Sequence, residues 1–484
     1  MMNRGPIGAA PLLAFSASAG LLLALAVLAP GCGRVRDERT ADGRLIVHYW
    51  EKWTGFEGEA MQAVVDDFNA SQNRLFVQVL TVSQINRKML MAAAGGNPPD
   101  VAGIWSSDVT DYAEKGALTP LNRMLDRAGI SRTNYIPVFW DLCSHRGFVW
   151  ALPSTPASVA LHWNRKMFRD AGLDPDRPPH TLDELDAMGE QLTVVEIERE
   201  GKPARVRFSE LTAAEKAAHR FKLLEVGHLP QEPGWWSTLW VYWFGGDLWD
   251  GDRRITATSP ESVEALRWYG KHAEKYGVDN LRSFGASFGN FSSPQNPFLS
   301  GRVAMEIQGV WMYNFIDKYA PHLEWGVAPF PAKDPARFPL VTIAESDVLV
   351  IPKGARHPKE AFDFIRYACS QGPAEKLALG QRKFTPLADV NPGFIEKHPN
   401  PYIKTFIDLA KSPQARTTPR MSIWTEYGDE LGVAITRVMS LKATPEETLA
   451  QVQERVQWKF DRTLRRWDAV KDDRLKEWSE YDAR

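Results

Sequence analysis

The chain of 484 residues carries 58 basic and 60 acidic side chains, and this balance excludes nucleic acid as the main partner, because phosphate binding needs a basic excess. The length predicts two or more domains. The hydrophobic content of 44% is typical of a soluble globular protein.

Residues 1–31 have the pattern of an export signal. Arg4 gives the positive start, an apolar core runs over 21–28, and small residues lead up to Cys32. The apolar run is shorter than a membrane span requires, so we expect an exported protein. The run APGC at 29–32 resembles a bacterial lipoprotein cleavage box, which implies that Cys32 is lipidated and anchors the chain to the membrane. An ordinary signal peptide with an incidental cysteine is the alternative.

The segment 44–116 is predicted to form alternating strands and helices, because its apolar residues recur with periods of two and of 3.6. The expected elements are a strand over 44–49, a loop over 50–55, a helix over 57–70, a strand over 75–82, a helix over 89–94, a strand over 101–104 and a helix from Thr110 to Gly116. Trp105 and Asp108 come directly after a strand. In open α/β sheets this is where ligands bind, beyond the carboxyl ends of the strands.

The second half of the chain is rich in turns and aromatic residues. We expect a polar loop over 196–233 with one short helix near 213–219, an aromatic helix over 239–244, an exposed loop over 283–297 and a mostly helical tail over 445–484. Helical spacing places Trp240, Trp243 and Phe244 on one buried face of the aromatic helix. Trp235 and Trp236 precede this helix and are better placed to contact a ligand.

Four ordered blocks of sequence resemble one known family. The blocks are AAAGGNPPDV with YAEKGALTPL within 92–121, the run over 147–185, FLSGRVAMEIQGVW at 298–311, and LVIPKG at 349–354 with the segment 358–370. They are similar to the solute-binding proteins of bacterial ABC importers, in particular the sugar-binding group that includes maltose-binding protein. The resemblance extends from Arg44 to about Val456.

This resemblance implies an α/β, two-lobe, periplasmic-binding-protein-like fold with discontinuous lobes, a hinge and an interlobe ligand cleft. It places 44–150 and 303–352 in lobe 1, and 153–302 and 353–484 in lobe 2. Crossovers between the lobes are expected near 151–153, 300–302 and 351–353, where prolines and a glycine suit short, defined joints.

The implied function is capture of a carbohydrate outside the cytoplasmic membrane and its delivery to the permease subunits of an ABC importer. No chemical step, cofactor or metal is expected, and the protein is expected to be a monomer. A binding protein for another solute, such as a glycerol-phosphate derivative or a peptide, remains an alternative. A phosphate would then contact Lys52 and Lys383. A secreted glycosidase is the third possibility, since the sequence does not fix the separation of its acidic residues.

The expected site combines aromatic rings, which bind the apolar faces of sugars, with polar side chains that bind sugar hydroxyls. We expect its acidic residues in loops that face the cleft. The expected ligand-binding residues are Trp50, Glu51, Trp105, Asp108, Ser154, Thr155, Trp236, Asp247, Trp311 and Glu345.

Other motifs are weaker. The sequence at 285–289 fits the G-x-S-x-G pattern of hydrolases, but that nucleophile needs a strand before it and a helix directly after it. The sequence has no zinc spacing, phosphate loop or dinucleotide fingerprint. Beyond Cys32 only Cys143 and Cys369 occur, so we expect buried thiols and no disulfide framework.

Overall fold

The computed structural model describes residues 37–289 and 291–483. The expected export signal over 1–31 and Cys32 lie outside the described residues. Within the part that is described, no helix combines the length and the apolar character needed to cross a membrane. Cys143 and Cys369 are both buried free thiols, as expected.

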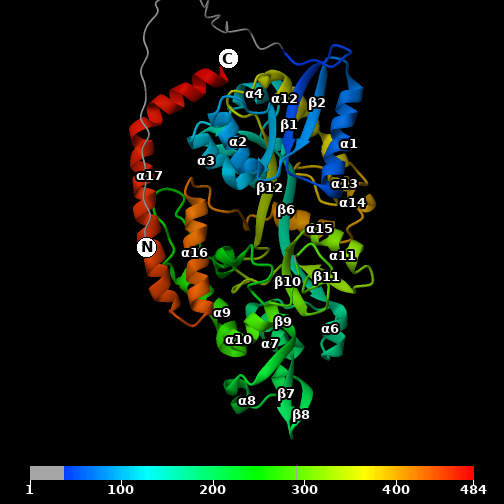
Figure 1. The fold of residues 1–484 in the computed structure, drawn as a ribbon, viewed down its shortest axis with the longest axis vertical. Helices are drawn as coiled ribbons and strands as arrows, with labels where there is room; N and C mark the ends of the chain where they lie inside the picture. Colours follow the sequence, from blue (N-terminus) through cyan, green and yellow to red (C-terminus); the bar gives the residue numbers. More distant parts are fainter. Residues whose placement is uncertain (1–36, 290, 484) are drawn as a thin grey trace, which may run out of the picture. The chain divides into compact units, whose positions relative to one another are not determined.

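A single large sheet forms the centre of the described chain (Figure 1), with the strand order β2-β1-β3-β12-β6-β10-β9-β7-β8. The strands are β1 Leu45–Glu51, β2 Leu75–Thr81, β3 Val101–Trp105, β6 Ala151–Asn164, β7 Val194–Arg199, β8 Lys202–Arg207, β9 Phe221–His228, β10 Val303–Gly309 and β12 Thr342–Val350. Two short strands join this path, β11 Trp325–Ala328 beside β6 and β13 Ala415–Arg416 beside β12. The strands β1, β2 and β3 are mutually parallel, whereas β12 runs antiparallel to both β3 and β6.

The helices of the first part follow the sequence pattern. In α1 (Gly55–Ser71) the buried residues are Met61, Val64, Val65 and Phe68, the face expected from their spacing. The other helices that pack in this region are α2 Ile85–Ala94, α3 Val109–Glu114, α4 Asn122–Ala128, α5 Pro137–Leu142, α12 Pro358–Ala368 and α13 Gln371–Gln381. The expected strands and helices between residues 44 and 116 are therefore confirmed.

Strands β6 and β12 connect two hydrophobic clusters. Leu152 of β6 and Leu349 of β12 belong to a first cluster with the core of β1 to β3. Leu161 of β6 and Ile343 of β12 belong to a second cluster. Between these ends the register of the two strands shifts at Asp347 and Val348. The polar residues Ser154 and Thr155 of β6 and 345–347 of β12 lie between these ends, and Ala160 and Ala344 pack in a third, smaller cluster.

The prediction of a loop over 196–233 is wrong. Strands β7 and β8 pair as an antiparallel hairpin, and β9 pairs with β7. Glu200 and Gly201 connect the hairpin, both with positive φ (54° and 73°), as a two-residue turn of this kind requires. No side chain of β8 is fully buried, so the sequence of this strand carries no core-facing apolar pattern. The short helix in this region, α8 (Ala213–Ala218), is confirmed.

The helices that cover the second cluster are α6 Arg165–Asp170, α7 Leu182–Leu192, α9 Pro260–Tyr276 and α16 Trp424–Met439. Three other helices, α10 Val278–Gly285, α11 Met312–Tyr319 and α15 Ile403–Lys411, pack in smaller separate clusters. The aromatic segment over 237–244 is a 3-10 helix, not an α-helix, and its Trp240, Trp243 and Phe244 are buried as expected. Ser287 of the G-x-S-x-G run follows helix α10 and no strand, so the hydrolase geometry is missing there.

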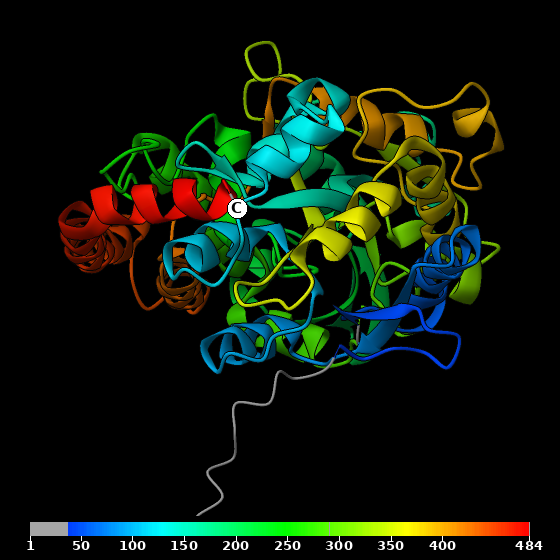
Figure 2. The same ribbon diagram turned by 90° about the horizontal axis from the view of Figure 1, so that it is seen from above.

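The tail forms one helix of 38 residues, α17 (Pro445–Asp482). Its first half packs on the second cluster through residues such as Val452 and Phe460. Its second half packs on the first cluster through Trp467 and Trp478. The carboxyl end of α17 lies beside α4 (Figures 1 and 2), where the Asp482 carboxylate accepts a hydrogen bond from the backbone N–H of Arg123.

Candidate functional site

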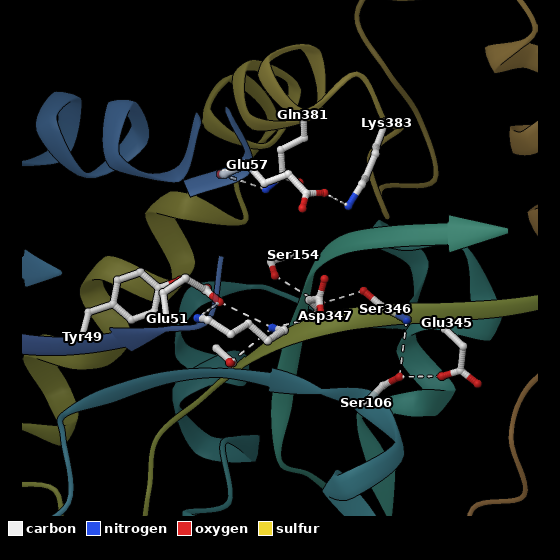
Figure 3. A network of polar contacts seen from close by, with 12 residues as sticks. Tyr49, Glu51, Glu57, Ser106, Ser154, Glu345, Ser346, Asp347, Gln381 and Lys383 are labelled. Carbon is white, nitrogen blue, oxygen red and sulfur yellow. Dashed lines mark hydrogen bonds and ion pairs between the residues drawn. The ribbon is translucent and has the colours of Figure 1, made fainter. Parts of the chain in front are cut away.

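A buried ion cluster lies at the carboxyl end of β1, beside β3 and β12 (Figure 3). Lys52 Nζ lies 3.0 Å from Asp347 Oδ1 and 3.4 Å from Glu51 Oε1. Glu51 also accepts hydrogen bonds from the Tyr49 hydroxyl and from the backbone N–H of Lys52. A side chain at Gly103 would collide with the Glu51 carboxylate, with a Cβ only 2.2 Å from Oε2. Glycine in β3 therefore makes room for the cluster.

One cation and two carboxylates interact in this cluster. Burial would lower the pKa of Lys52, but the carboxylates of Asp347 and Glu51 outweigh burial and raise it above its usual value. Burial raises the pKa of Asp347, although Lys52 and Lys383 oppose the shift. Lys52 thus stays charged and already has two carboxylate partners.

A second set of polar contacts surrounds Glu345. Ser106 Oγ donates to Glu345 Oε2 and the backbone N–H of Thr418 donates to Oε1, both over 2.9 Å. Ser154 Oγ donates to the carbonyl of Asp347 over 3.1 Å (Figure 3). Burial raises the pKa of Glu345 despite these hydrogen bonds. The acid is held in one orientation by groups from two separate segments.

Several acids do not lie in loops as expected. Glu345 is in the middle of β12, and Glu51 is the last residue of β1. Trp50 also lies in β1, on the opposite face from Glu51, because successive strand residues alternate. The ring beside the ion cluster is that of Trp53, with Lys52 Nζ 4.8 Å from its centroid. The strands extend further than the apolar pattern indicates because polar residues occupy their ends and middles.

Trp105 and Asp108 lie together next to this cluster. Trp105 ends β3 and is 48% exposed, which is unusual for so large an apolar side chain. Lys52 Nζ lies 5.6 Å from the centroid of its ring, within the range of a cation–π contact. Burial, with a further contribution from Asp111, raises the pKa of Asp108 to about 6. The structure thus brings Glu51, Asp108 and Glu345 into one acidic region with an exposed indole.

Trp236 and Trp311 form a second aromatic group. Their ring centroids are 6.2 Å apart, and Trp235, which is 42% exposed, lies 5.8 Å from Trp311. Trp311 Nε1 donates to Gln308 Oε1 over 3.1 Å, and Gln308 Nε2 donates to Glu306 Oε1 over 2.9 Å. A buried polar chain in β10 therefore fixes the orientation of the Trp311 ring.

The sequence reasoning missed the acids of this second group. Burial raises the pKa of Glu306 to about 8, with a smaller contribution from Glu232, and burial raises that of Glu232 to about 7. In the sequence of β10, Glu306 and Gln308 alternate with apolar residues, and this pattern could have identified them. Buried atoms without a hydrogen-bond partner in the described chain include Thr155 Oγ1, Gln231 Oε1, Trp236 Nε1 and Glu306 Oε2.

Asp247 lies at a further part of this region. Its Oδ1 is 3.7 Å from Arg416 Nε, and burial raises its pKa against the opposing effect of this cation. Nearby, the Tyr242 hydroxyl donates to the carbonyl of Thr417 over 2.8 Å. A cavity of about 340 Å³ is lined by Tyr242 and Asp247, by the segment 412–420 and by α5. Its size lies in the range of small-molecule sites.

Lys383 pairs with an acid as Lys52 does. Lys383 Nζ lies 2.5 Å from Glu57 Oε1 (Figure 3) and 4.9 Å from the centroid of the Trp53 ring. The two lysines that a phosphate ligand would need are therefore both occupied by carboxylates. Across residues 37–289 and 291–483, no group of three or more His, Cys, Asp or Glu side chains is arranged to hold a metal ion.

The family model of the bacterial extracellular solute-binding proteins matches residues 55–375. The chain belongs to this family. A putative binding protein of Brucella abortus is 22% identical to it over 439 residues, which cover 89% of this chain and 95% of the relative. The solved structure of CpMnBP1 with mannotriose bound is 25% identical, has a TM-score of 0.70, and covers 85% of this chain and 99% of its own.

UgpB from Mycobacterium tuberculosis, solved in complex with glycerophosphocholine, has a TM-score of 0.66 at 19% identity. It covers 87% of this solute-binding protein and 100% of its own chain. The expected family and the two-lobe α/β fold class are confirmed by these findings. The two solved neighbours carry different kinds of ligand on this fold.

Proposed function

We propose that this solute-binding protein captures a carbohydrate outside the cytoplasmic membrane and delivers it to the permease of an ABC importer. The observation that carries the proposal is the acidic, aromatic region around Trp105. An indole that is 48% exposed there adjoins the carboxylates of Asp108 and Glu345. Indole faces suit the apolar faces of sugar rings, and carboxylates accept hydrogen bonds from hydroxyls. The neighbour CpMnBP1 was solved with mannotriose.

The polar atoms that lack partners support the same ligand class. The Thr155 hydroxyl can donate and accept, Glu306 Oε2 donates when the acid is protonated, and Trp236 Nε1 donates; all three atoms are buried without a partner in the described chain. Buried polar groups normally have hydrogen-bond partners. A sugar hydroxyl both donates and accepts, so one kind of ligand group can satisfy all three atoms.

The charge of the site argues against a phosphate ligand such as the one in the UgpB complex. Lys52 is bound by Asp347 and Glu51, and Lys383 is bound by Glu57. A phosphate would have to displace these carboxylates and leave them buried without a counter-ion, which costs about 3–5 kcal/mol for a buried pair. A neutral ligand leaves the ion pairs intact.

We also propose that the two lobes are the parts of the chain that pack around the two hydrophobic clusters. The packing favours placing 303–341 in the second lobe and 358–387 in the first, instead of the allocation made from the sequence. The long strands β6 and β12 would then join the lobes. A sugar that contacts both lobes binds the closed form better and shifts the population toward it.

Export of a monomeric, lipid-anchored protein remains part of this proposal. The family is one of extracellular proteins, which supports export, and the APGC run at 29–32 supports lipidation of Cys32. Changing Cys32 to Ser should release the protein from membranes, as followed by fractionation and intact mass. We propose no chemical step, in keeping with a family of solute-binding proteins.

The test is isothermal titration calorimetry with neutral manno- and malto-oligosaccharides, and with glycerophosphocholine and glycerol 3-phosphate. We expect a neutral oligosaccharide to bind with micromolar affinity or better, about 8 kcal/mol. A product assay on the same sugars addresses the glycosidase alternative. Binding of the phosphate compounds alone would overturn the proposal.

A further inference from the structure

A second cavity, of about 420 Å³, lies against the inner side of α17. Thr110 and Glu114 of α3 line it from the side of the first cluster. Trp249 and Arg253 line it from the side of the second cluster, and the α17 segment 460–471 forms a wall. Its volume is within the range of small-molecule sites.

This cavity adjoins the candidate site. Thr110 follows Asp108 by two residues, and Arg420, which also lines the cavity, follows Thr418 by two. The N–H of Thr418 is the group that binds Glu345. Arg420 and Trp249 line both this cavity and the 340 Å³ cavity beside Asp247. A ligand that occupies the candidate site therefore has neighbouring space to extend into.

Most charged groups of the cavity are paired with one another, and the Arg420 guanidinium donates to the backbone carbonyl of Asp141. Glu114 Oε1 is 3.0 Å from His145 Nε2 and 3.5 Å from an Arg146 guanidinium nitrogen. Asp468 is 3.0 Å from Arg253, across the space between α17 and the loop over 250–254. Paired charges have no need of an ionic ligand, but their remaining lone pairs and N–H groups can bind hydroxyls. The lining thus suits a neutral polyhydroxylated group.

The α17 wall is fixed in place by packing beyond the cavity. Trp467 stacks on Trp478, with centroids 5.6 Å apart and planes at 27°. Trp478 packs edge-on against Trp150 at 4.8 Å, and Arg146 lies over Trp467 at 4.8 Å. The second half of α17 is therefore anchored on the first cluster, and it limits the cavity on that side.

We propose that this cavity is an additional sugar-binding subsite and that α17 limits the length of the oligosaccharide at this end. The inference rests on the proposed function, because it assigns a further unit of the same ligand. The inference implies that the ligand is an oligosaccharide and that the carboxyl-terminal helix α17 helps to select the length of this oligosaccharide.

The experiment fills the subsite and measures how affinity depends on chain length. Thr463 lies on α17 and lines the cavity, so Thr463→Trp places an indole in the space of a sugar ring. Arg466→Trp is the matched control, because Arg466 is on the same helix, is exposed and does not line the cavity. Calorimetric titrations use the mono- to tetrasaccharides of one neutral series with the full-length chain.

For the wild type and Arg466→Trp we expect affinity to rise with each added sugar up to a limit. For Thr463→Trp we expect an affinity loss of at least tenfold for the longest ligand and less than twofold for the shortest one bound. Retained binding of the short ligand shows that the variant is folded, and Thr463→Phe repeats the test with a smaller side chain.

Two other outcomes overturn the inference. If the wild type binds sugars but Thr463→Trp and Thr463→Phe keep the wild-type length dependence, the subsite is wrong and the proposed function stands. If the wild type binds no sugar of any length, the proposed function fails and the subsite fails with it.

Discussion

Replacing Lys52 by Met tests the buried ion cluster directly. The side chains of Lys52, Glu51 and Asp347 are only 7%, 4% and 10% exposed, and the lysine is within 3.4 Å of both acids. Met keeps most of the length of the side chain and removes the charge. The two carboxylates are then buried without their cation, and breaking a buried pair in this way costs about 3–5 kcal/mol. We expect a loss of that size in the free energy of unfolding.

The assay is urea unfolding followed by tryptophan fluorescence at several pH values. Because burial already raises the pKa of Asp347, loss of Lys52 should raise it further, above its value in the unfolded chain. The folded variant then binds more protons than the unfolded chain, so the stability deficit should shrink as the pH is lowered. In a double-mutant cycle, Lys52→Met with Asp347→Asn should lose less than the sum of the single changes.

The matched control is Lys166→Met. Lys166 pairs with Asp170 one turn along α6, and both side chains are more than half exposed, so this change should cost no more than about 0.5 kcal/mol. If Lys52→Met and Lys166→Met unfold at the same urea concentration at every pH, the assignment of a buried, mutually dependent cluster is refuted.

Three further predictions concern other parts of the chain. Trp478→Ala should destabilise the protein by about 3–5 kcal/mol in urea unfolding, because the ring is buried against Trp150, whereas Trp458→Ala on the exposed face of α17 should have little effect. Trp105→Ala should weaken sugar binding at least tenfold in calorimetry with little change in stability, and equal effects on both would contradict its role as an exposed ligand contact. Glu306 has a pKa of about 8, above its unfolded value, so it costs stability progressively as the pH rises from about 4.5 to 8. The stability of Glu306→Gln relative to the wild type should therefore increase over that interval, and a pH-independent difference would contradict the buried, protonated acid.

The elements that could be predicted from the sequence are those with one continuous core-facing pattern. Met61, Val64 and Phe68 recur at helical spacing, and they define the buried face of α1. Strands that change surroundings along their length could not be predicted in full. In β12, Ile343 and Leu349 pack in different clusters, with the polar residues Glu345 to Asp347 between them. A count of apolar residues over a short window therefore predicts a loop at these polar residues.

The residues of the candidate site could likewise be predicted only in part from the sequence. Trp105 and Asp108 are predicted from their position at and just beyond the end of a strand, which is visible in sequence. The pairing of Lys52 with Asp347 is not predicted, because the two residues are far apart in the chain and meet only through the strand order β1-β3-β12. The alternation in β10 marks Glu306 as a polar residue of a strand, but its raised pKa and that of Glu232 come from burial, which the sequence does not show.

We infer that the polar segments of β6 and β12 link the proposed binding to the proposed lobe motion. Ser154 and Asp347 lie there between the two clusters, and the register shift next to Asp347 marks a bulge in the ladder. Hydrogen bonds and the Lys52 ion pair hold the segment around Ser154 and Asp347. Bulges of this kind commonly bend strands beside functional sites. A polar segment can therefore serve both as the joint between the proposed lobes and as part of the surface that binds hydroxyls. A ligand bound there would contact residues whose geometry changes if the proposed lobes close, which is the differential contact that a population shift requires.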